Sequence, residues 1–226
     1  MTNNQPTPIL SSTPIDSLNP EELAPVQQYF KLFKPYGCLS QFVQEAKRPK
    51  PVLGDLYPFP EKTMAVGRLD HDSEGLLLLT TDGQFSYNIC GKHVEKEYWV
   101  QLDGEINENA IRKLQTGVDI GIKGEKYRTL PCQVRRLNTE PKLPPRGRKI
   151  RDARHGPTSW ISICLSEGKN RQIRKMTAAV GSPTLRLIRV RIGNIHLKQL
   201  QPGNVENIAN YIENSHLKQI NAPNQG

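Results

Sequence analysis

The sequence predicts an α+β fold in which helices flank a mixed, largely antiparallel β-sheet. Segments with a strand pattern outnumber segments with a helical pattern, and most strands follow one another directly. The chain has 226 residues, of which 36% are hydrophobic and 23% are charged, as is ordinary for a globular protein with a sizeable core.

The two ends of the chain differ in composition from its middle. Residues 1–27 are rich in Pro, Asn, Ser and Thr, which predicts a flexible N-terminal arm. Residues 28–214 are the predicted folded domain, and residues 215–226 are a predicted frayed tail. Neither a secretory signal nor an apolar run of membrane-spanning length is present in the sequence. We therefore expect a cytoplasmic protein without a membrane partner.

Strands and loops alternate in the first half of the chain. The aromatic-rich residues 29–33 predict a strand, and a proline and a glycine end it. Residues 48–62 form a loop punctuated by prolines. The segments "TMAVGRL" (63–69) and "GLLLLT" (75–80) predict two further strands, the second fully buried and closed by the turn "TTDG".

The second half combines strands with two helices. Helices are predicted at 107–117, with Asn107 as N-cap, and at 170–181. Residues 139–157 are expected to form an exposed basic loop. Strands are predicted at residues 95–105, 130–137, 158–166 and 184–193. Strand alternation in the last of these predicts that Arg189 and Arg191 share one face.

The positive charge is concentrated in one segment. The chain has a net charge of +9, and residues 146–191 contain twelve Lys or Arg against two acids, which is a net of +10. A localised basic segment favours a polyanionic partner, and nucleic acid is the first candidate. From charge alone, a solvated basic loop is the alternative.

The cysteines give no sign of a metal site. Cys38, Cys90, Cys132 and Cys164 are scattered, and none belongs to a CxxC pair. We expect reduced, mostly buried thiols and no bound metal.

Three acids, Asp70, Asp72 and Glu74, stand directly before a run of four leucines. Charges beside a buried segment cost free energy unless they are paired or used. Asp70 follows Arg68 at the predicted end of a strand, where a scaffold can hold a side chain rigidly over an open face. For Asp72 and Glu74, capping of local turns is the favoured interpretation.

Two other kinds of site fit this acidic stretch poorly. An EF-hand beginning at Asp70 needs a bidentate Glu at its twelfth position, where this chain has Thr81. A carboxylate pair for glycoside hydrolysis needs aromatic platforms, and only 6% of the residues are aromatic. A metal-dependent nuclease needs further clustered acids, which the sequence does not offer.

Four sequence blocks together carry a family resemblance. The stretch "GRLDHDSEGLLLLTTDG" resembles the signature of the RsuA-type ribosomal pseudouridine synthases. The blocks "FKPYGCLSQF", "EKEYWV" and "EGKNRQIRKMTAAVG" with "LRLIRVRIG" resemble the other family blocks, in the family's order. The resemblance covers about residues 29–205.

The resemblance implies the pseudouridine synthase catalytic fold and a uridine substrate in ribosomal RNA, expected to be the 23S RNA of the large subunit. Only about 28 residues precede the first block, so we expect no S4 domain. Because the isomerisation neither gains nor loses atoms, no cofactor is expected, and we expect a monomer. An RNA-binding or ribosome-assembly factor on the same scaffold is the alternative.

The resemblance also assigns roles to individual residues. Asp70 is implied as the catalytic carboxylate, either as nucleophile at C1′ or as base at C2′. Tyr98 is implied to stack on the base and take the C5 proton, and Arg174 to keep Asp70 ionised. Without the resemblance, Tyr98 would be read as a core residue and Arg174 as a helix-surface residue. The expected substrate-binding residues are Lys34, Arg68, Arg146, Arg148, Lys149, Arg151, Arg171, Leu187, Arg189 and Arg191.

Overall fold

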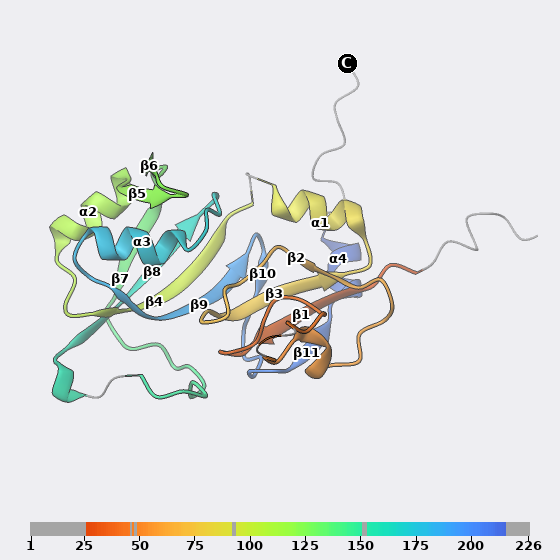
Figure 1. Cartoon of the computed structure of the whole chain (residues 1–226). Coiled ribbons are helices and arrows are strands. Elements are labelled where there is room, and N and C mark those ends of the chain that lie inside the picture. Colours follow the sequence, from red (N-terminus) through yellow and green to blue (C-terminus); the bar gives the residue numbers. More distant parts are fainter. Residues whose placement is uncertain (1–25, 46, 48, 92–93, 151–152, 216–226) are drawn as a thin grey trace, which may run out of the picture.

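The computed structural model describes residues 26–45, 47, 49–91, 94–150 and 153–215 (Figure 1). The predicted arm (1–27) and the predicted tail (215–226) lie almost entirely outside these residues.

Nine strands form one sheet within the described part of the chain. They are β1 (Tyr29–Lys34), β2 (Met64–Val66), β3 (Glu74–Thr80), β4 (Lys96–Asp103), β7 (Gln133–Leu137), β8 (Thr158–Leu165), β9 (Thr184–Ile192), β10 (Ile195–His196) and β11 (Val205–Asn207). The strand order is β11-β1-β3-β9-β4-β8-β7, with β2 paired to β3 and β10 paired to β9. A separate hairpin consists of β5 (Asp119–Ile122) and β6 (Glu125–Arg128).

The sheet has two antiparallel halves that meet at a single parallel junction. β3 and β9 pair in parallel through Glu74 opposite Ile188 and Gly75 opposite Arg189, whereas the other strand pairs are antiparallel. Gly75 has a φ of 103°, and a Cβ there would lie 2.3 Å from the backbone oxygen of Arg189. Only glycine permits this approach. The prediction of a mixed, largely antiparallel α+β fold is confirmed.

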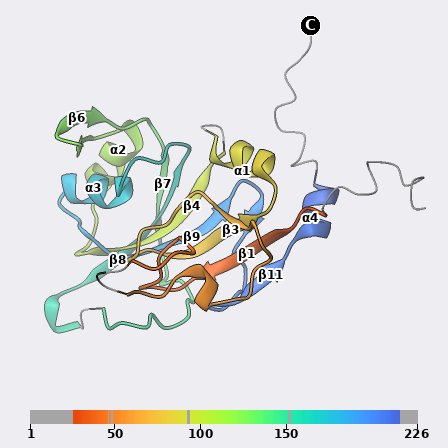
Figure 2. The ribbon, with the colours of Figure 1, turned by 45° about the vertical axis from the view of Figure 1, so that its right-hand side comes forward.

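The helices flank the two halves. Helix α2 (Glu108–Thr116) and helix α3 (Gln172–Ala179) lie with the β5–β6 hairpin beside the β4–β8–β7 half, as Figures 1 and 2 show. Asn107 caps α2 as predicted, because its side chain accepts from the Ala110 N–H at 2.9 Å. Helix α1 (Gly83–Cys90) and helix α4 (Ala209–Asn214) lie at the β1–β3 half.

The leucine run fills both faces of strand β3. Leu76 and Leu78 belong to one apolar cluster, and Leu77 and Leu79 belong to another. All four side chains are fully buried. A strand covered on both sides carries a continuous apolar run rather than an alternating one, as the sequence predicted.

Candidate active site

Asp70 lies on a loop between β2 and β3, not at the end of a strand. The predicted strand 63–69 ends at Val66. Gly67 has a positive φ of 69°, which starts the loop. Ser40 then fixes the backbone of Leu69 from both sides, because its hydroxyl accepts from the Leu69 N–H at 3.0 Å and donates to the Leu69 carbonyl at 2.9 Å. Asp70 therefore has a fixed backbone, although the sequence placed it on a different element.

The Asp70 loop opens onto a cavity of about 640 Å³. Tyr98 of β4 and Leu187 of β9 line the cavity together with Asp70 and Arg68. Cavities of this size accept ligands as large as a nucleoside. The structure thus brings together the carboxylate, the tyrosine and the apolar wall that the sequence analysis singled out.

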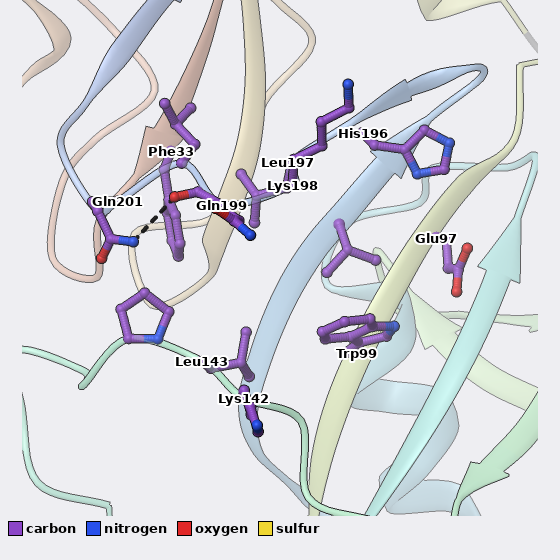
Figure 3. A pocket seen from close by; sticks show the side chains of 13 residues that line it. Phe33, Glu97, Trp99, Lys142, Leu143, His196, Leu197, Lys198, Gln199 and Gln201 are labelled. Atoms are coloured by element: carbon purple, nitrogen blue, oxygen red, sulfur yellow. Dashed lines mark hydrogen bonds between the residues drawn. The ribbon is translucent and has the colours of Figure 1, made fainter.

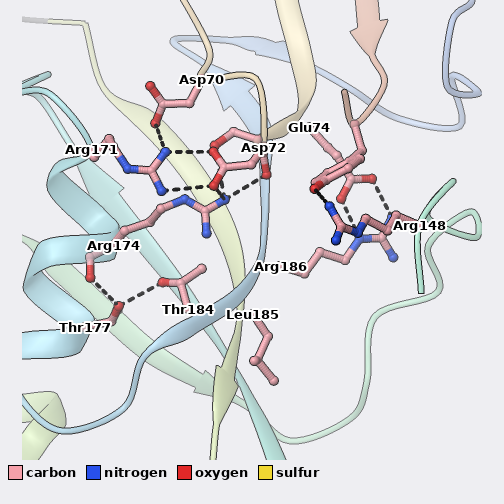
Figure 4. A network of polar contacts seen from close by, with 12 residues as sticks. Asp70, Asp72, Glu74, Arg148, Arg171, Arg174, Thr177, Thr184, Leu185 and Arg186 are labelled. Atoms are coloured by element: carbon pink, nitrogen blue, oxygen red, sulfur yellow. Dashed lines mark hydrogen bonds and ion pairs between the residues drawn. The ribbon is translucent and has the colours of Figure 1, made fainter. Parts of the chain in front are cut away.

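Arg171 is the arginine that pairs with Asp70. Its Nη1 lies 3.7 Å from Asp70 Oδ2, and its two terminal nitrogens each donate to a different oxygen of Asp72 at 2.9 Å (Figure 4). Arg171 directly precedes α3 in the left-handed conformation, with a φ of 51°. Its guanidinium thereby meets the loop of acids, and one arginine holds two carboxylates.

The prediction that Arg174 pairs with Asp70 is wrong. Arg174 lies in α3, and its Nη2 donates to the backbone carbonyl of Asp72 at 2.8 Å and lies 3.5 Å from Asp72 Oδ2 (Figure 4). Its side chain is largely buried at that point. Arg174 therefore stabilises the loop by binding the backbone and the side chain of Asp72, and it does not contact Asp70.

Asp72 and Glu74 do not cap turns, contrary to the interpretation of the sequence. Partial burial disfavours the ionised form of Asp72, but the hydrogen bonds from Arg171 and the charge of Arg174 outweigh it and lower its pKa. Glu74 is buried and forms a two-pronged ion pair with Arg186, in which both distances are 2.9 Å. Each of the three acids is therefore paired with an arginine.

The first part of the basic loop folds back against the Asp70 side of the molecule. The Arg146 guanidinium lies 3.9 Å from the centre of the Tyr36 ring and donates to the Leu185 carbonyl at 3.1 Å. Arg148 is exposed and donates to the Tyr36 hydroxyl at 3.3 Å. Tyr36 in turn lies against His71, with 5.9 Å between ring centres. Arg146 is consequently a packing residue, whereas Arg148 is at the surface.

Comparison with known proteins identifies the family to which this fold belongs. The family model described as RNA pseudouridylate synthase matches residues 28–179. This chain belongs to the RNA pseudouridylate synthase family. The motifs of the sequence are most like those of ribosomal large subunit pseudouridine synthase E, and relatives of that name match most of the chain.

Relatives of known sequence and structure cover most of the chain. Ribosomal large subunit pseudouridine synthase E from Xanthomonas campestris is 45% identical over 174 residues, which are 76% of this chain and 90% of that protein. The protein of the same name from Vibrio parahaemolyticus is 41% identical, over 75% of this chain and 69% of that protein. A crystal structure of pseudouridylate synthase superposes with a TM-score of 0.67 at 28% identity, over 87% of this chain and 74% of that one.

Lys34, which was expected to bind the substrate, does not line the candidate active-site cavity. It is fully buried, and its Nζ donates to the carbonyls of Cys38 at 2.7 Å and Pro35 at 3.1 Å. Burial lowers the pKa of Lys34 to about 8, against the opposing charges of nearby acids. Lys34 therefore holds the loop that follows β1, next to the Asp70 loop.

Arg189 and Arg191 do not share a face, because strand β9 contains a bulge. Glu97 pairs with Arg191 and Tyr98 pairs with Arg189, so Val190 is an extra residue on β9. Arg191 lies on the far face, where its Nε donates to Glu97 at 3.0 Å. Arg189 stays on the Tyr98 face and is 4% exposed.

The remaining predicted basic residues lie either at the surface or outside the described residues. Arg68 is exposed at the cavity and donates to the Gln41 side chain at 3.2 Å. Lys149 is exposed on the basic loop. Arg151 lies outside the described residues.

A second cavity, of about 1100 Å³, lies on the far face of β4. Trp99, Leu143 and Leu197 are among the residues that line it, and none of the predicted site residues that the structure describes does so (Figure 3). Because neighbouring strand residues point to opposite faces, Trp99 faces this cavity while Tyr98 faces the candidate active site.

The described residues contain no group of three or more His, Cys, Asp or Glu placed to hold a metal ion. None of their helices is long and apolar enough to cross a bilayer.

Sequence reasoning missed two residues that shape the site. Arg186 gave no periodic signal and is found only through its ion pair with Glu74. Tyr36 stands in the "FKPYGCLSQF" block between Pro35 and Gly37. An aromatic residue in such a turn is a signal that could have been used.

Proposed function

We propose that this chain isomerises uridine to pseudouridine in the 23S RNA of the large ribosomal subunit, with Asp70 as the catalytic carboxylate. The observation that carries the proposal is the joint placement of Asp70, Tyr98 and Leu187 on one nucleoside-sized cavity, with Arg171 paired to the carboxylate. The choice of large-subunit RNA is supported by relatives named for that activity at up to 45% identity over most of the chain.

The proposed reaction moves one bond on the uracil ring. The bond between N1 and C1′ breaks, the base turns, and a bond between C5 and C1′ forms. The proton on C5 leaves, and N1 gains a proton, so the product is an isomer of the substrate. Because this balance needs no electrons and no added group, we propose that the enzyme uses neither a cofactor nor a metal.

Asp70 acts on the sugar in this scheme. It attacks C1′ as a nucleophile or removes a proton from C2′ as a base, and both roles need the carboxylate form. The guanidinium of Arg171, whose Nη1 lies 3.7 Å from Asp70 Oδ2, pairs with this carboxylate and fixes its direction. Arg174 acts as a positioning residue, since it holds Asp72, the other partner of Arg171.

Tyr98 and Leu187 receive the base. A uridine in a stacked strand must leave its stack for Asp70 to reach C1′. The Tyr98 ring then stacks on the uracil, and Leu187 provides an apolar wall. Splayed bases of this kind occur in RNA loops and bulges, where sequence-specific RNA recognition concentrates. The Tyr98 oxygen accepts the C5 proton while its own hydroxyl proton passes to water, and water returns a proton to N1.

The RNA backbone is bound by charges outside the cavity. Arg68 at the rim of the cavity, and Arg148 and Lys149 on the basic loop, are exposed and suit phosphate contacts that do not depend on sequence. We further propose that the enzyme is a monomer and that it works in the cytoplasm, where its ribosomal RNA substrate is made and assembled.

Release of tritium from C5-labelled uridine tests the proposal, because the label leaves only when C5 is substituted. We expect release from unmodified 23S RNA, or from an assembly particle that contains it, with EDTA present. Small-subunit RNA should release none. If neither substrate released label while the protein still bound 23S RNA, the chain would be a binding or assembly factor. Loss of release on adding EDTA would instead indicate a metal.

A further inference from the structure

A further hollow, distinct from the cavity beside Trp99, adjoins the candidate active site. It has a volume of about 440 Å³ and shares Arg68, Tyr98 and residues 167–169 with the catalytic cavity. Lys96 of β4 and Arg189 of β9 line it but do not line the catalytic cavity. We call it the Lys96–Arg189 hollow.

Arg189 is a cation in the lining of this hollow, and one of its donors has no partner among the described residues. The residue is 4% exposed, and its Nε donates to the Leu76 carbonyl at 2.7 Å. Its Nη2 is buried and has no hydrogen-bond partner in the described part of the chain. A buried charged donor without a partner costs free energy, so such an atom beside an open hollow indicates a missing acceptor.

Lys96 adds a second cation without a described carboxylate partner. It is half-buried, and burial together with the charge of Arg189 lowers its pKa. The acid in the same wall, Glu167, is already engaged, since it accepts from the Tyr127 hydroxyl at 2.6 Å and from the Leu130 N–H at 2.9 Å. Glu167 therefore does not form the counter-ion of Lys96 and Arg189.

We propose that the Lys96–Arg189 hollow binds the phosphate group next to the target uridine. This inference rests on the proposed function, since it places the base in the catalytic cavity and the phosphate in the hollow beyond Tyr98. Phosphate oxygens would accept hydrogen bonds from Arg189, and their negative charge would pair with Lys96. The described residues offer neither cation a carboxylate partner. The flipped nucleotide would thereby be held at its base and its backbone, on either side of Tyr98.

Binding of mononucleotides tests this inference without turnover. Calorimetric titration should compare uridine, uridine 3′-monophosphate and uridine 5′-monophosphate on the wild-type protein, on Lys96→Gln and on Lys113→Gln. Lys113 is exposed on α2 and lines neither cavity, so it controls for the loss of one charge. We expect one of the two nucleotides to bind the wild type about tenfold more tightly than uridine, as for one charge-assisted contact. That advantage should fall below about threefold in Lys96→Gln and persist in Lys113→Gln.

The inference is overturned if neither nucleotide has an advantage over uridine, or if Lys96→Gln keeps the full advantage. Thermal melting separates a ligand role from a structural one. Because Lys96→Gln removes one of two neighbouring cations, the free variant should melt no lower than the wild type, and inorganic phosphate should stabilise it less. A lower melting temperature with an unchanged response to phosphate would make Lys96 a packing residue. Since these readouts need no catalysis, their failure is distinct from an absence of tritium release.

Discussion

Three acidic residues stand at alternate positions from 70 to 74, and their surroundings give them different roles. Glu74 is buried and forms an ion pair with Arg186 of β9, so its charge stabilises the contact between β3 and β9. Asp72 takes the two-pronged contact of Arg171. Among the described residues, the Asp70 carboxylate pairs only with Arg171, at the longer distance, and it faces the cavity. The carboxylate with the fewest fixed partners is therefore the one available for chemistry.

Tyr98→Phe should damage the chemical step more than RNA binding. The ring still stacks on the base, but the hydroxyl that takes the C5 proton is gone. We expect a fall of about 100-fold or more in the single-turnover rate, as for loss of a general base, with little change in RNA affinity. Tyr87→Phe, at a side chain that is 75% exposed on α1, should have no effect. A rate for Tyr98→Phe equal to that of Tyr87→Phe would remove the hydroxyl from the mechanism.

Lys34 should make stability depend on alkaline pH. Its pKa is about 8 in the folded protein and close to 10.5 when unfolded, so the unfolded state binds more protons between these values. Stability must therefore rise with pH across this window as the buried charge is lost, by on the order of 3 kcal/mol. Urea unfolding of the wild type and of Lys34→Met between pH 7 and pH 10.5 measures this. The difference between them should grow in favour of the wild type above pH 8, and a constant difference would contradict the assignment.

At the scale of single elements, strand β3 is the piece that connects the chemistry to the fold. Its first residues, Glu74 and Gly75, form the parallel junction with β9, and the loop before it carries Asp70. The other half of the sheet supplies Tyr98 and Leu187. The distance between carboxylate and base is therefore set by how closely β3 approaches β9.

Gly75→Ala should separate the two halves of the sheet. The added Cβ would lie 2.3 Å from the Arg189 carbonyl oxygen at a φ of 103°, so both backbone strain and a clash oppose it. We expect a loss of about 3 kcal/mol or more in the free energy of unfolding. Gly83→Ala is the matched control, since nothing lies within 4 Å of its added Cβ at the start of α1. Denaturant unfolding of both variants decides, and equal stabilities would show that the junction tolerates a side chain.

The sequence predicted best those elements whose signal is local. The leucine run, the Asn107 cap and the long strands were readable from composition and period. Helix α1 was missed because its N-cap, Asp82, belongs to the stretch "TTDG", which also reads as a turn. The bulge at Val190 was not predictable, because an extra residue shows only when the partner strand β4 is known.

At the scale of the whole molecule, the candidate active site lies where the two halves of the sheet meet. The family blocks predicted which residue types matter, and the structure supports Asp70, Tyr98 and Leu187 as neighbours on one cavity. The pairing of basic residues with acids was not readable. Arg171 rather than Arg174 meets Asp70, because this contact joins segments about a hundred residues apart. The Lys34 side chain binds carbonyls only one and four residues away, but its burial depends on how the rest of the chain covers β1.

The basic loop should contribute to RNA binding through its exposed residues alone. Arg148→Gln with Lys149→Gln should lower the slope of log affinity against log salt by about 1.4 to 1.8, at 0.7 to 0.9 per phosphate contact. Arg112→Gln with Lys113→Gln on α2 removes the same charge and should leave the slope nearly unchanged. RNA titrations over several salt concentrations check both. Equal slopes for the two double variants would show that the loop does not bind RNA. Arg146 is left intact, because it packs on Tyr36.

The central claim is that Asp70 carries the reaction, and a single isosteric change tests it most directly. Asp70→Asn keeps the shape of the side chain but removes the charge that attacks C1′ or takes the C2′ proton. Asp119→Asn, on the surface hairpin at β5, is the same change away from the cavity. Tritium release from C5-labelled 23S RNA should be abolished in Asp70→Asn and unchanged in Asp119→Asn, with circular dichroism and RNA affinity unchanged in both. Release by Asp70→Asn at a rate near that of the wild type would contradict the account.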